Sequence, residues 1–116
     1  MHAVSQERFE ELVAQALDDV PAELMALLSN VVVTVEDDSP AGQPRLLGRY
    51  EGIPLTQRTT WYSGVLPDRI TIYRRPILSM CRTDDEVVRE VHVTVVHEIA
   101  HHFGIDDDRL HELGYG

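Results

Sequence analysis

The chain has 116 residues, which is the usual size of one domain with a core of its own. Its formal net charge is -10, and its 10 basic residues are all arginines set against 20 acidic residues. Because contacts to phosphate need clustered cations, this balance argues against nucleic acid and anionic membrane as partners. Apolar residues make up 43% of the chain, so that it should fold rather than stay disordered.

The sequence also bears on the compartment. The N-terminal stretch MHAVSQERFEELV lacks the basic start and apolar run of a signal peptide, and no segment has the roughly 18 apolar residues of a membrane span. Cys81 is the only cysteine, which leaves no partner for an internal disulfide and favours a reducing compartment. We therefore expect one cytoplasmic domain over residues 1–116, with Cys81 as a small buried apolar residue.

Helices are predicted at the N-terminus. Apolar residues recur at three- and four-residue spacing over residues 5–17, and Ser5 is a suitable N-cap. Pro21 interrupts this pattern, and a second, short helix is expected over residues 22–28.

Short strands are predicted in the middle of the chain. The β-branched run at 31–35 is the first, and an acidic loop with prolines follows it over 36–44. Further strands are expected at 46–50 and 70–73, and a short one at 61–62. Pro67-Asp68 reads as a turn, and Pro76 should end the strand at 70–73.

A long helix is predicted near the C-terminus. Thr83 and Glu86 form a capping box at its start, and Gly104 follows its expected end at residue 103. Its residues are apolar over most of the circumference, so that it should be mostly buried, and a last short helix is expected over 107–113. The fold class is therefore α+β, with N-terminal helices, a sheet of three or four short strands, and the long helix packed on the sheet.

The polar residues of this buried helix need an explanation, because burying them without partners is costly. They occur in the run HEIAHH, residues 97–102. His97 and His101 are four residues apart, so that they share one helix face and can bind one zinc ion. Glu98 lies one residue round from His97 and is placed to accept a proton from a zinc-bound water rather than to ligate the metal. His102 points away from His101 and is expected to pack or to support a ligand.

A catalytic zinc needs a third protein ligand and an open fourth position. Asp107 completes the pattern HExxHxxGxxD after the turn at Gly104, and it is our candidate. His111 and Asp108 remain alternatives, because residues 106–108 also suit the acidic start of a helix. An aspartate ligand would leave the zinc less positive and more of the proton removal to Glu98.

The segment TVVHEIAHHFGIDDDRLHELGY resembles the signature of the small bacterial zincin-like metallopeptidases, and weaker likeness extends through LLGRYEGIPLTQR and residues 68–76. The resemblance implies a minimal zincin core of helices against a short twisted sheet. It also implies His97, His101 and Asp107 as zinc ligands and Glu98 as general base. The aspartate and the lack of any methionine after Met80 set the chain apart from the metzincins.

The function expected from these residues is zinc-dependent hydrolysis of a peptide bond in a peptide or protein substrate. The rival is a metal-binding regulatory or interaction domain that keeps the zincin shell without useful turnover. Tyr73, Arg74 and Tyr115 are candidates to steady an oxyanion, although each also suits a structural role.

The substrate is expected to add to a sheet edge, and the strand at 70–73 is our candidate for that edge. Its side chains should alternate, with Thr71 and Tyr73 on one face and Ile70 and Ile72 on the other. Arginines at positions 69, 74 and 75 flank this strand and suggest that acidic side chains are tolerated near the scissile bond; the alternative is that they only balance nearby acids.

Overall fold

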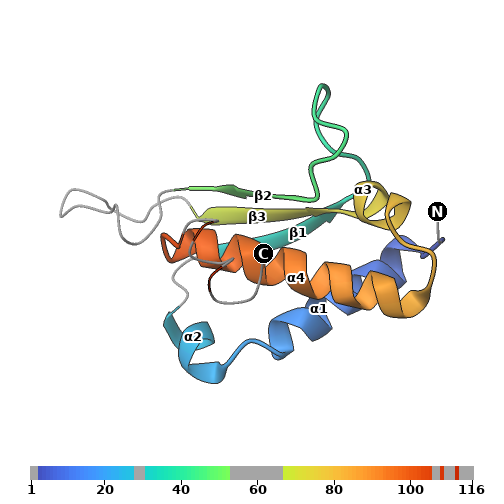
Figure 1. Ribbon diagram of the computed structural model, residues 1–116. Coiled ribbons are helices and arrows are strands. Elements are labelled where there is room, and N and C mark those ends of the chain that lie inside the picture. The colour runs from blue at the N-terminus through green and yellow to red at the C-terminus, as the bar shows by residue number, and fades with distance from the viewer. Residues whose placement is uncertain (1–2, 28–30, 53–66, 106–107, 109–111, 113–116) are drawn as a thin grey trace.

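The computed structural model describes residues 3–27, 31–52, 67–105, 108 and 112. Its elements in chain order are α1 (Gln6–Asp18), α2 (Ala22–Leu27), β1 (Val31–Glu36), β2 (Gly48–Glu51), β3 (Asp68–Tyr73), α3 (Arg74–Ser79) and α4 (Asp84–His102). A three-stranded sheet forms one layer, and α1 and α4 lie against one face of it (Figure 1). The α+β class and the helix-on-sheet arrangement are therefore confirmed. Residues 61–62 and most of 107–113 lie outside the described residues.

The sheet has the order β1-β3-β2, with β1 parallel and β2 antiparallel to β3. The prediction that residues 70–73 form an edge is therefore wrong, because β3 is the central strand. Its alternation is confirmed: Ile70 and Ile72 join the hydrophobic core with the apolar residues of β1 that pair with them. Closeness in sequence to the long helix says nothing about strand order, which depends on β1 and β2 pairing from elsewhere in the chain.

The ends of α4 follow the local sequence signals. The hydroxyl of Thr83 accepts the backbone N–H of Glu86 at 3.2 Å, and the Glu86 carboxylate accepts the N–H of Arg82 at 2.8 Å. At the other end Gly104 has φ 77, and its N–H donates to the carbonyl of His101 at 3.0 Å. The N–H of Ile105 donates to Ala100 at 2.9 Å, which completes a Schellman motif. The chain therefore turns sharply just after His101 and His102.

The short helix α3 was not predicted. Pro76, expected to end a strand, lies instead in the first turn of this helix, where the missing N–H of proline leaves no bond unmade. Cys81 follows α3 and is buried, with its Sγ 3.3 Å from the carbonyl oxygen of Ile77. Burial raises the pKa of the Cys81 thiol, in keeping with its expected role as a small apolar residue.

The core lies between the sheet, α1 and α4. α1 contributes one apolar stripe and α4 another, and β3 supplies the facing side chains. The central buried residues are Phe9, Leu12, Val13, Ala16, Ile70, Ile72, Ile77, Leu78, Val87, Val91, Val95 and Ile99. Within the described part of the chain, no helix is long and apolar enough to cross a membrane.

Candidate metal centre

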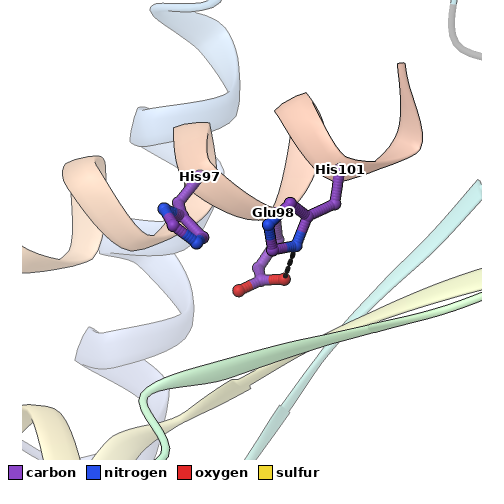
Figure 2. A group of neighbouring side chains, drawn as sticks. All are labelled: His97, Glu98 and His101. Atoms are coloured by element: carbon purple, nitrogen blue, oxygen red, sulfur yellow. Dashed lines mark hydrogen bonds and ion pairs between the residues drawn. The ribbon is translucent and has the colours of Figure 1, made fainter. Parts of the chain in front are cut away.

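Three side chains of α4 come together in its last two turns. His97, Glu98 and His101 each offer a ligand atom, and these atoms lie within 4.8 Å of one another. The two imidazole rings stack edge to face, with centroids 4.6 Å apart, because one helical turn separates them. Figure 2 shows all three side chains on the side of α4 that faces the sheet. The grouping predicted from the HExxH spacing is therefore present.

Glu98 is the most buried of the three, with 5% of its surface exposed. Its Oε1 lies 3.1 Å from Nδ1 of His101 (Figure 2). The backbone of β2 passes close to the Glu98 side chain at Gly48. A Cβ atom on Gly48 would lie 3.1 Å from Cγ of Glu98 and 2.9 Å from Cγ2 of Thr94. Glycine at this position therefore lets the strand approach the helix and leaves room for the carboxylate.

These donors fit a zinc ion. When Nδ1 of His101 carries the proton and donates it to Glu98, the lone pair of Nε2 is available to a metal. Ligating histidines commonly donate their other ring nitrogen to a carboxylate in this way. His97 and His101 supply the imidazole pair that zinc prefers, and Glu98 supplies an acceptor beside it.

The candidates for the third ligand are only partly described. Asp107 and His111 lie outside the described residues. Tyr115, a candidate to stabilise an oxyanion, also lies outside them. Asp108 is described: it is exposed, and the cluster of potential ligands in the described residues does not include it.

Two other candidates face elsewhere. Tyr73 is buried on the face of the sheet opposite to Ile72 and the helices, and its surroundings include Arg49, Glu36 and Glu51. Burial raises the pKa of the Tyr73 hydroxyl. Arg74 donates from Nε to Asp37 at 2.9 Å and from Nη1 to the carbonyl of Val4 at 2.8 Å. These surroundings do not support Tyr73 or Arg74 as a donor to an oxyanion at the metal centre.

Two of the three arginines that suggested tolerance for acidic side chains near the scissile bond form ion pairs within the protein. Arg75 pairs with Asp38 at 2.8 Å, next to the pair of Arg74 with Asp37. These contacts bear out the structural alternative, in which the arginines balance nearby acids, for two of the three residues.

A buried polar network supports the C-terminal turn of α4, and the sequence did not reveal it. Nδ1 of His102 lies 2.9 Å from Oδ2 of Asp68, and the hydroxyl of Tyr50 donates to the same oxygen at 2.6 Å. A Cβ atom on Gly52 would collide with the Asp68 carboxylate. The packing role expected of His102 is met by its contacts with Asp68 of β3 and with the ring of Tyr50 of β2. Asp68, read as a turn residue, in fact begins β3.

A pocket of about 230 Å³ opens directly beside the cluster. Its helix wall is Glu90, Val93, Thr94, His97 and Glu98, and its other wall is Leu46, Leu47 and Gly48. A larger hollow of about 620 Å³ lies between the loop at 38–44 and α3, and none of the three clustered residues lines it.

The comparisons with known proteins agree with this geometry. A family model described as zincin-like metallopeptidase matches residues 28–116. A solved structure, a conserved hypothetical protein from Thermo thermophilus, is similar with 27% sequence identity and a TM-score of 0.60, covering 86% of this chain and 94% of its own. No curated protein is similar enough to match. With the HExxH helix, the small mixed sheet and a family match over most of its length, the chain belongs to the zincin-like metallopeptidases.

Proposed function

We propose that the chain is a zinc metallopeptidase in which His97, His101 and Asp107 hold the metal and Glu98 is the general base. The observation that carries this proposal is the placement of Glu98. A structural zinc site is normally closed by four protein ligands and needs no base. Here a nearly buried carboxylate lies beside the imidazole pair, and Gly48 leaves space for it.

Zinc at this position would supply Lewis acidity, which lowers the pKa of water and polarises the carbonyl of the substrate. Glu98 accepts the proton of the attacking water and can return it to the amine that leaves. The contact with His101 and the wall formed by Gly48 limit the positions that the Glu98 carboxylate can adopt. His97 and His101 are held at fixed separation by one turn of α4, so that the helix itself sets the geometry of two ligands.

The strand at the edge of the sheet next to the site is β2, and not the strand at 70–73 that was expected from the sequence. The N–H of Tyr73 donates to the carbonyl of Leu47 at 2.9 Å, so that residues 47, 49 and 51 face β3 with their backbone groups. Gly48 and Tyr50 then turn their backbone groups away from β3. Within the described residues no further strand pairs with β2, and an extended peptide can add here with main-chain hydrogen bonds.

The experiment combines metal analysis with a cleavage assay on a peptide library. The purified chain should carry about one zinc per monomer, and Glu98→Gln should keep the zinc and the fold while hydrolysis falls by about 10²–10⁴-fold. Asp85→Asn, an exposed change on the same helix, is the control that should leave both unchanged. Zinc without hydrolysis would support the rival metal-binding module, and absence of zinc uptake would refute both.

A further inference from the structure

The pocket beside the cluster has a regular helix wall. Glu90, Val93, Thr94, His97 and Glu98 occupy positions i, i+3, i+4, i+7 and i+8 of α4, so that they form one stripe along the helix. Leu46 and Leu47 face this stripe from the segment that leads into β2. The pocket is therefore a slot between the helix and the chain that we propose as the substrate edge.

The two ends of the slot carry different chemistry. His97 and Glu98 lie at one end of the slot. Glu90 lies at the other end, seven residues before His97, which corresponds to a rise of about 10 Å along the helix. Apolar walls from Leu46, Leu47 and Val93 lie between them. Only a long side chain can reach Glu90 from a backbone held at the catalytic end.

The slot also has an acidic character, because the described residues that line it include two glutamates and no arginine. Other acids of the chain have arginine partners: Glu11 pairs with Arg8 and Asp38 pairs with Arg75. Glu90 is half-buried and has no such partner within the described residues. A carboxylate that is partly removed from water at the end of an apolar slot favours a cation there.

We propose that this slot is the specificity pocket of the peptidase and takes a lysine or arginine side chain next to the scissile bond, with Glu90 binding its charged end. The inference rests on the proposed function and adds the substrate class to it. The methylenes of such a side chain can pack on Leu46, Leu47 and Val93 while the cation reaches the carboxylate. An acidic side chain would meet Glu90 and the field of a chain with net charge -10, so that it is disfavoured.

Binding tests the pocket without relying on turnover. Peptides that differ at one position, with lysine, norleucine or glutamate, are titrated into metal-free and zinc-loaded protein, and binding is followed by calorimetry. Lysine should bind about fivefold more tightly than norleucine, the scale expected of a partly exposed ion pair. Glu90→Gln should remove this preference and Glu90→Arg should transfer it to glutamate, whereas Asp85→Asn, the same loss of charge outside the slot, should change nothing.

Cleavage separates this proposal from the one on which it rests. Hydrolysis of the library with a basic preference that Glu90→Gln abolishes supports both proposals. Hydrolysis that is indifferent to lysine and arginine overturns the pocket and leaves the peptidase. If no peptide is cleaved the peptidase fails, and the binding titrations still decide: a lysine preference that depends on Glu90 supports the pocket, and equal binding of the three peptides overturns it.

Discussion

His102 and Asp68 face each other across the core with 2.9 Å between Nδ1 and Oδ2, and neither side chain exposes more than 2% of its surface. The contact joins the last turn of α4 to the first residue of β3, and Tyr50 adds β2 to the same carboxylate. Because His102 directly follows His101, the network fixes the end of the helix that carries the second proposed ligand.

Removing His102 should therefore cost more than removing an ordinary histidine. His102→Ala leaves the buried Asp68 carboxylate without its ring partner and should lower the free energy of unfolding by about 2–4 kcal/mol. Tyr50→Phe, which deletes only the hydroxyl that donates to this carboxylate, should cost about 1.5–3 kcal/mol. Urea unfolding measures both changes. His92→Ala, at a half-exposed position on the same helix, is the control, and equal losses in the two histidine variants would contradict the role of the network.

Gly48→Ala should damage activity more than stability. The added methyl group would lie 2.9 Å from Cγ2 of Thr94 and 3.1 Å from Cγ of Glu98, so that the side chain of the proposed general base must move. We expect kcat to fall by about tenfold or more, since a small misplacement of a reacting group is costly. Thr94→Ser in the same chain removes Cγ2 and should restore part of the rate.

Gly42→Ala is the matched control for this substitution. Nothing lies within 4 Å of its Cβ position, and its φ of +84 makes alanine strained there. It should lower stability without changing kcat. Full activity in Gly48→Ala would show that the close approach of β2 does not constrain Glu98.

The third ligand can be identified by zinc affinity. Asp107→Ala should weaken zinc binding strongly, by more than about a hundredfold, because loss of a residue that only supports a ligand typically costs about 10–100-fold. Asp106→Ala and His111→Ala should not. Competition with a chromogenic chelator measures the affinities, and loss of the metal in His111→Ala alone would move the assignment to that residue.

The pair of Arg74 and Asp37 should appear in the pH dependence of stability. The hydrogen bond from Arg74 lowers the pKa of Asp37 below its ordinary value of 3.8. A carboxyl whose pKa is lower in the folded state contributes stability above its unfolded pKa, and this contribution is lost as the pH falls through the folded value. Asp37→Asn should thus be less stable than the parent at neutral pH, and the difference should shrink below about pH 4. Urea unfolding across this range tests it, and a gap that stays constant with pH would be the contrary result.

The sequence predicted what is decided locally. The caps at Ser5 and Thr83, the turn at Gly104, and the grouping of His97 with His101 depend on residues a few positions apart, and all are present. Strand order and the contact of His102 with Asp68 depend on residues 18 to 37 positions apart, which periodicity does not report. α3 was missed because a proline tolerated in a first turn was read as a stop.

The packing of α1 against α4 has a consequence for how this chain can be divided. The family match begins at residue 28, yet Phe9, Leu12 and Val13 of α1 belong to the same core as Val87 and Val91 of α4. The helix that carries His97, Glu98 and His101 thus packs against a segment that the family match does not include. A fragment of residues 28–116 would expose the apolar side of that helix to water and should aggregate or unfold. We therefore expect the cooperative folding unit to begin before residue 28, where the family match begins.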